Sequence, residues 1–122
     1  MNYSTNLKTT THLDKRMNVR GISKSMIEFA VSYGELHSDK LILNKKLVKR
    51  MVETINVQAI RLKRLRKKFG QFSVVRLIDK ALNKLREQKG IALKVLAKGG
   101  VVVVVANNTL ITTYNLDSYK KY

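Results

Sequence analysis

Five consecutive valines, Val101–Val105, constrain the fold of this chain more than any other feature. Valine favours β-strands because its branched side chain packs well on a pleated surface. Successive side chains of a strand point to opposite faces of the sheet, so an unbroken apolar run needs cover on both faces. The run therefore predicts a buried strand, and the rest of the chain must supply the layers that cover it.

Asn107 and Asn108 follow the valine run and predict a two-residue turn, because asparagine tolerates the positive φ angles that such turns require. Residues 109–116 then return as a second strand. The alternation of this strand puts Leu110, Thr112 and Tyr114 on one face and Ile111 and Thr113 on the other.

Four segments before the valine run have apolar residues every three or four positions, which predicts helices. They cover about 12–20, 23–33, 45–69 and 73–88, and the third could break near Asn56. Short polar residues mark the starts of these helices and glycines mark their ends. The expected N-terminal caps are Thr11 (in a capping box with Asp14), Ser23, Asn44 and Ser73, and the expected end residues are Gly21, Gly34, Gly70 and Gly90.

Three segments have weaker patterns. Residues 40–44 form a short apolar run after a polar loop and are expected to be a strand. Residues 91–97 fit either a strand or an extension of the preceding helix. Residues 1–10 are rich in threonine and asparagine and are predicted to be a flexible arm, with a short edge strand as the alternative.

Together these elements predict a single α+β domain over residues 1–122. We expect helices packed on one side of a small antiparallel sheet that ends in a C-terminal β-hairpin. No apolar run approaches the length of a membrane span. Residues 1–11 are polar and lack the apolar segment of a signal peptide. We therefore expect a cytoplasmic protein that does not contact the membrane.

The charge of the chain points to an acidic partner. The sequence has 25 Lys and Arg but only 8 Asp and Glu, a net charge of +17, and such an excess favours polyanions. The densest basic run lies at 61–68, where acidic residues are absent. We expect nucleic acid, either RNA or the ribosome, to bind there, although a merely solvated helix face is the alternative. The predicted nucleic-acid-binding residues are Arg61, Lys63, Arg64, Arg66, Lys67 and Lys68.

His12, Arg16 and Arg20 recur every four residues, so a helix places them on one face. Metal-independent RNA cleavage needs a proton carrier and fixed cations beside the phosphate. His12 suits the first role and the two arginines suit the second. The alternative is structural: the arginines pair with helix ends or with Asp14, Glu28 or Glu35, and His12 supports the first helical turn.

Metal and cofactor sites are not expected. The chain has no cysteine, which excludes disulfides and thiolate ligands. Its two histidines are far apart in sequence, and acidic residues are few. His37, between Glu35 and Asp39, is interpreted as a solvated loop histidine.

Residues 11–34 carry a recognisable motif, His-x-x-x-Arg-Met-x-x-Arg-Gly-Ile-Ser followed by a helix that ends in Tyr-Gly. It resembles the opening of a family of small bacterial domains of unknown function, with Leu13 where alanine is usual. The strand–turn–strand of residues 101–114 is similar, less specifically, to the ending of that family. The family is in turn similar to the RelE/ParE-like toxins, which include ribosome-dependent and free ribonucleases and gyrase inhibitors.

The resemblance implies a toxin-type protein with a RelE/ParE-like fold. It makes residues 45–88 a long helical insertion relative to the compact members. It places Tyr114 where such toxins carry a residue that stacks on a base or moves a proton, whereas an ordinary strand tyrosine would join the core. It also implies an acidic antitoxin protein as a partner.

Three functions therefore follow from the sequence. The first is a toxin-type protein that acts on RNA or the ribosome, in its enzymatic form a metal-independent endoribonuclease with catalytic residues His12, Arg16, Arg20 and Tyr114. The second is a non-catalytic nucleic-acid- or ribosome-binding module. The third is an interaction protein whose basic face receives an acidic partner.

Overall fold

The computed structural model describes residues 8–119. A five-stranded sheet lies at the centre of its compact part, which we call the base. The strand order is β1-β5-β4-β3-β2, and every pairing is antiparallel except the parallel pair β1–β5. Residues 1–7 of the N-terminal segment that was predicted to be flexible lie outside the described residues. Lys8 and Thr9, near the end of that segment, form the edge strand β1. The strands are β1 (Lys8–Thr9), β2 (Glu35–His37), β3 (Lys40–Asn44), β4 (Gly100–Ala106) and β5 (Thr109–Asn115).

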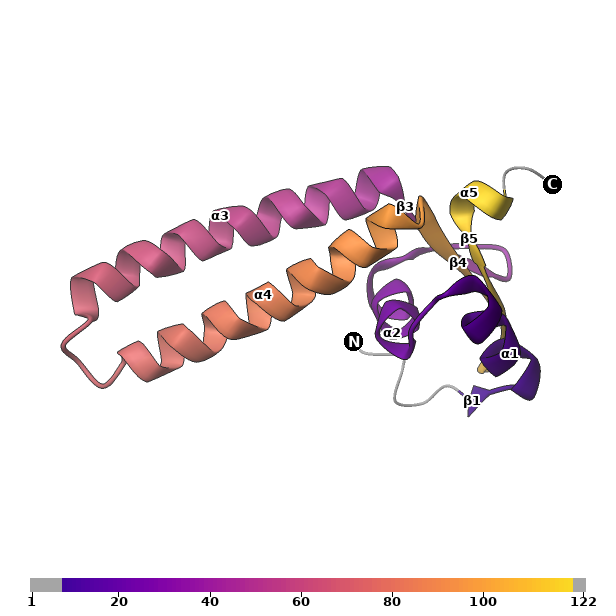
Figure 1. Cartoon of the computed structure of the whole chain (residues 1–122), viewed down its shortest axis with the longest axis horizontal. Helices are drawn as coiled ribbons and strands as arrows, with labels where there is room; N and C mark the ends of the chain where they lie inside the picture. The colour runs from indigo at the N-terminus through magenta and orange to yellow at the C-terminus, as the bar shows by residue number, and fades with distance from the viewer. Residues whose placement is uncertain (1–7, 120–122) are drawn as a thin grey trace.

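The helices confirm the α+β class. α2 covers one face of the sheet beside β3 and β4, and α1 lies along β5. The two longest helices, α3 and α4, lie side by side and project from the base as an arm (Figure 1). The helices are α1 (Thr11–Arg20), α2 (Lys24–Tyr33), α3 (Lys45–Phe69), α4 (Val75–Ala97) and α5 (Leu116–Tyr119).

The C-terminal hairpin forms as predicted. Asn107 and Asn108 have φ angles of 48° and 61° and connect β4 to β5. The predicted faces of β5 are wrong, however, because an irregularity at Val104/Val105 shifts the register. Val105 pairs with Leu110 and Val103 with Thr113, so these residues share the core face. Thr112 and Tyr114 lie on the opposite face, beside Val104 and Val102.

The valine strand is the centre of the core. Val101, Val102 and Val103 are fully buried, whereas Val104 and Val105 are partly exposed toward the turn. The core cluster joins Val101 and Val103 to side chains of β3, α2 and the base-proximal ends of α3 and α4. Its members in those elements include Leu43, Met26, Ile27, Ala30, Val48 and Val95.

Two helix starts differ by one residue from the prediction. Thr10, not Thr11, caps α1, and its hydroxyl accepts a hydrogen bond from the Leu13 amide. Adjacent threonines offer the same chemistry, but Thr10 also donates to the Ile111 carbonyl of β5, which the sequence does not reveal. Val74, not Ser73, precedes α4 and gives it no side-chain cap. Ser23 and Asn44 cap α2 and α3 as predicted.

The two long helices are more continuous than predicted. α3 has no break near Asn56. α4 does not end at Gly90 but continues to Ala97, so residues 91–97 are a helical extension. A mid-helix glycine costs about 1 kcal/mol relative to alanine. Burial of Ala92 and Val95 beyond it outweighs that cost, because both side chains are fully enclosed in the core.

The arm is inserted into a connection between neighbouring strands. Asn44, the last residue of β3, pairs with Gly100, the first of β4, and the arm occupies the residues between them. Gly100 has φ +105°, and a Cβ atom there would lie 2.6 Å from the Leu43 carbonyl oxygen, so only glycine fits where the chain re-enters the sheet. Within residues 8–119, no helix is long and apolar enough to cross a membrane.

Candidate functional site

The α1 cluster consists of His12, Arg16, Arg20 and Tyr114, the four residues predicted to be catalytic. The spacing of four residues on α1 brings Arg16 next to His12: the Arg16 Nε atom donates to the His12 Nε2 atom at 3.4 Å. The Arg20 guanidinium carbon lies 4.3 Å from the centre of the Tyr114 ring. The structure therefore places the four residues in two pairs, one on α1 and one between α1 and β5.

Arg20 also has a structural role. Its Nη1 atom donates to the Thr113 carbonyl oxygen at 2.7 Å. The Thr10 hydroxyl donates to the Ile111 carbonyl at 3.0 Å, whereas the described residues of β1 pair with Thr109 and Leu110. The two side chains of the α1 region thus bind carbonyls of β5 beyond the reach of β1, and so protect this sheet edge.

Exchanging Arg20 for methionine should lower the free energy of unfolding by about 1–2 kcal/mol, because a charged hydrogen bond and a cation–π contact are lost. The matched control is Arg16→Met on the same helix, whose bond to His12 is exposed and should contribute less than about 0.5 kcal/mol. Urea unfolding followed by circular dichroism measures both. Equal losses for the two variants would contradict the edge-binding role of Arg20.

His12 and Arg16 form the accessible half of the α1 cluster. His12 is exposed and Arg16 is partly exposed, so both can be reached by a ligand. The neutral imidazole can accept a proton at Nε2 once that atom separates from the Arg16 Nε atom, and a guanidinium can hold a phosphate through two parallel hydrogen bonds. The pair thus has groups that suit a phosphodiester, while Arg20 is engaged at the strand. Within the described part of the chain, no three His, Asp or Glu side chains gather as metal ligands.

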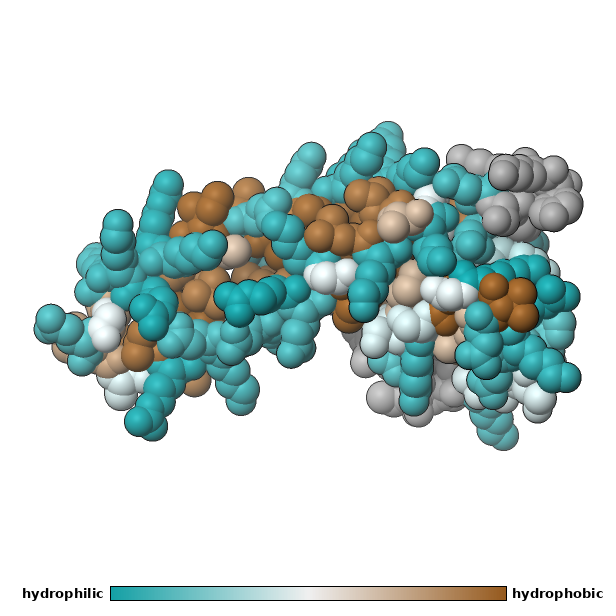
Figure 2. All heavy atoms as spheres, in the orientation of Figure 1, coloured by the Kyte–Doolittle hydropathy of each residue, from teal (hydrophilic) through white to brown (hydrophobic). Residues whose placement is uncertain are grey.

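The α3–α4 arm carries most of the charge. Residues 45–97 contain 16 of the 25 basic residues and three of the eight acidic ones, which leaves a net charge of +13 on the arm out of +17 for the chain. Figure 2 shows hydrophilic side chains projecting along the arm. All six predicted nucleic-acid-binding residues are exposed near the end of α3: Arg61, Lys63, Arg64, Arg66, Lys67 and Lys68.

Arg66 differs from the other five because it joins the two helices of the arm. Its Nε atom donates to the Asp79 Oδ1 atom at 2.6 Å, and its Nη2 atom to the Oδ2 atom at 3.3 Å. The hydrogen bond from Arg66 holds the pKa of the Asp79 carboxyl below its usual value, and the same bond raises the pKa of Arg66. Phe69 and Phe72 also meet edge to face, with ring centres 6.2 Å apart.

The Asp79 bridge should order the tip of the arm only while the carboxyl is ionised. Because the pKa of Asp79 is lower in the folded state, its stabilisation is present above the unfolded pKa of about 3.9 and is lost as the pH falls through the folded pKa. We expect the heteronuclear NOE of residues 70–74 to be high at pH 7 and to decrease as the pH falls through the folded pKa of Asp79. Asp79→Asn should already show low values at pH 7.

Glu87→Gln is the matched control for this prediction, since it removes one exposed carboxylate from the same helix. It should leave the NOE of residues 70–74 unchanged at pH 7. A tip that stays ordered in Asp79→Asn would show that the aromatic contact between Phe69 and Phe72 is sufficient.

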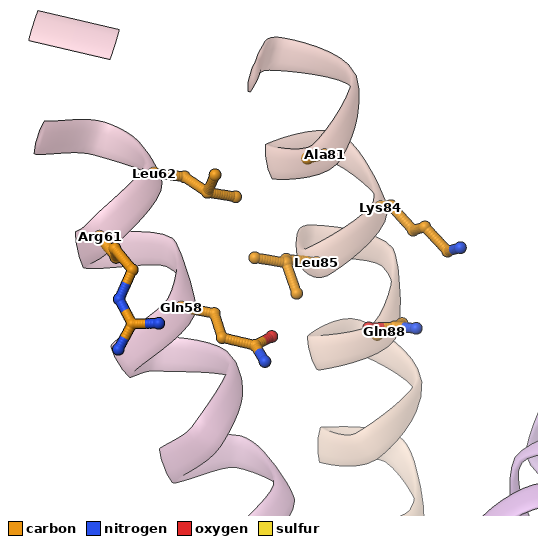
Figure 3. A pocket seen from close by; sticks show the side chains of 7 residues that line it. All are labelled: Gln58, Arg61, Leu62, Ala81, Lys84, Leu85 and Gln88. Atoms are coloured by element: carbon orange, nitrogen blue, oxygen red, sulfur yellow. The ribbon is translucent and has the colours of Figure 1, made fainter. Parts of the chain in front are cut away.

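Several features at the site escaped sequence reasoning. The Lys98 Nζ atom donates to the Arg20 carbonyl at 3.1 Å, and so binds the C-terminal end of α1 from a residue 78 positions away. His37 does not lie in a loop but in the exposed strand β2, where its ring contacts Glu35 at 3.4 Å. A hollow of about 430 Å³ between α3 and α4 was also not predicted. It is lined by Gln58, Arg61, Leu62, Ala81, Lys84, Leu85 and Gln88 (Figure 3).

A scan against protein-family models and searches of curated proteins and of solved structures found no match to this chain.

Proposed function

We propose that this protein is a RelE/ParE-like, toxin-type protein that binds RNA or the ribosome through its α3–α4 arm. One observation carries the proposal: the arm projects from the base and concentrates a net charge of +13 on two helices. A protein that neutralises phosphates with lysine and arginine gains free energy from the counterions that the nucleic acid releases. Five of the six basic residues at 61–68 remain for this role, because Arg66 is bound to Asp79.

The proposal is tested by titrating salt into complexes of the full chain with a fluorescein-labelled single-stranded RNA, and in parallel with purified ribosomes. If five cations contact phosphates, the slope of log K against log salt should be roughly −3.5, from about −0.7 per contact. Fluorescence anisotropy between 50 and 300 mM salt measures the slope. A flat line, or no binding at 50 mM salt, would contradict the proposal.

A second, enzymatic form of the function is favoured by the α1 cluster. The exposed His12–Arg16 pair provides a proton carrier beside a cation, two of the groups that metal-independent cleavage of RNA uses. In this form His12 takes the proton of the RNA 2′-hydroxyl, the 2′-oxygen attacks the phosphorus, and the P–O bond to the 5′-oxygen of the next nucleotide breaks. The leaving 5′-oxygen takes a proton from solvent water, so the products end in a 2′,3′-cyclic phosphate and a 5′-hydroxyl.

Incubation of end-labelled RNA with the protein in EDTA, with and without ribosomes, tests this form. Cyclic-phosphate ends in either reaction support it. Binding to RNA without any new ends, even on ribosomes, would remove the enzymatic form and leave the binding function in place.

A further inference from the structure

The arm has an open groove that binding to RNA does not explain. Near the base, a hollow of about 340 Å³ lies between α2 and α3 and reaches Gln58 and Gln88. The same two glutamines line the hollow of about 430 Å³ farther along the arm, so the two hollows adjoin. We call them together the arm groove. Its apolar lining includes Phe29, Tyr33, Met51, Leu62, Ala81 and Leu85.

Apolar side chains form the floor of the arm groove. Figure 3 shows Leu62 of α3 and Leu85 of α4 pointing toward each other between the helices, with Ala81 one turn away from Leu85. Figure 2 shows apolar side chains between the two helices of the arm, flanked by hydrophilic ones. Two helices alone cannot bury their apolar stripes fully, and Val57, Ile60 and Leu77 elsewhere on the arm are more than half exposed. A third helix laid into the groove would cover its floor.

Cationic side chains form the rim of the arm groove. Arg50, Arg61 and Lys84 line it, and none of the described residues that line it is acidic. Like charges oppose a second copy of this chain, because it would bring another arm of net charge +13 against the first. The groove is therefore complementary to a ligand with an apolar face and negative flanks.

We propose that the arm groove binds an amphipathic α-helix from an acidic partner protein. Its apolar face lies on Met51, Leu62 and Leu85, and its carboxylates face Arg50, Arg61 and Lys84. From Leu47 to Leu62 the groove extends for about 22 Å at 1.5 Å per residue, which suits roughly four turns of helix. The apolar floor carries this inference, which therefore does not depend on whether the arm binds RNA.

The probe for this site is a fluorescein-labelled 18-residue peptide with leucines in a helical stripe and glutamates elsewhere. Two comparison peptides replace every glutamate with lysine or every leucine with alanine. Only the leucine–glutamate peptide should bind the full chain, and it should gain helical circular dichroism when it binds. Equal binding of the alanine–glutamate peptide would show that charge alone is recognised and would overturn the proposal.

Two charge reversals on α4 locate the binding site. Lys84→Glu changes the rim of the groove, whereas Lys94→Glu makes the same change at an exposed residue outside it. The first should weaken binding of the leucine–glutamate peptide at least fivefold and the second less than twofold. Equal weakening of peptide binding by the two charge reversals would overturn the placement of the binding site in the arm groove. Sedimentation of the chain alone as a dimer that Lys84→Glu dissociates would also overturn the proposal, in favour of a second copy as occupant.

Discussion

Replacing Arg61, Arg64 and Lys68 with glutamine should weaken binding to single-stranded RNA by roughly fifty-fold at 0.15 M salt. Each lost phosphate contact removes about 0.7 from the salt slope, so three contacts should flatten it by roughly 2. The three side chains are exposed near the end of α3, where the arm lies farthest from the base. Anisotropy titrations of the variant and the wild type at several salt concentrations measure both quantities.

The matched control replaces Lys8, Lys15 and Lys24 with glutamine. It removes the same charge from exposed residues of the base. Its effect on affinity should be much smaller, about threefold or less, if contacts on the arm hold the RNA. Equal weakening by the two variants would mean that affinity follows net charge rather than the arm, and it would contradict the proposed interface.

Arg66 is kept in both variants because it holds the tip of the arm. Its removal would confound the loss of a phosphate contact with the loss of the bridge to Asp79. This distinction could not come from the sequence, because the two residues are 13 positions apart on different helices. The sequence shows a run of six cations near the end of α3, and only the folded arm shows which of them is already bound.

The fold was predictable where local pattern and tertiary packing agree. The valine run, the Asn107–Asn108 turn and the apolar stripe of α3 each specify one structure, and each is confirmed. Local signals failed where packing overrides them. Gly90 predicts a helix end, but Ala92 and Val95 belong to the core and hold the helix together beyond it.

Short strands and their register were the other limit of sequence reasoning. β1 has two residues and β2 has three, all exposed, so neither shows the alternation that marks a strand. Both form because a neighbouring strand offers free hydrogen-bonding groups. The shift at Val104/Val105 is also invisible in sequence, although it moves Tyr114 to the face away from the core.

In the candidate site, too, some features were predictable from the sequence and others depend on tertiary packing. The sequence predicted that His12 and Arg16 share one face of a helix, and the contact between them follows from that spacing of four residues. The Arg20–Tyr114 contact joins residues 94 positions apart, and the resemblance to toxins predicted only that Tyr114 would be near a site. The bond from Arg20 to the Thr113 carbonyl and the arm groove depend on tertiary packing and had no sequence signal.

His12→Ala should lower the rate of RNA cleavage by roughly 10²- to 10⁴-fold if His12 transfers the proton, which is the range for loss of a general acid or base. RNA affinity should be unchanged, since the arm makes the phosphate contacts. The free energy of unfolding should change by less than about 0.5 kcal/mol, because His12 is exposed and its side chain makes an exposed hydrogen bond with Arg16. Cleavage of end-labelled RNA, anisotropy and urea unfolding measure the three effects.

His37→Ala is the matched control, because it removes the other histidine of the chain from the exposed strand β2. It should leave cleavage, binding and stability unchanged. If both histidine variants cut RNA like the wild type, His12 is not the proton carrier, and its contact with Arg16 is only a surface bond. If His12→Ala alone stops cleavage while RNA stays bound, capture and chemistry belong to different parts of the molecule. The arm would then hold RNA for a reaction on α1, at the other end of the chain's fold.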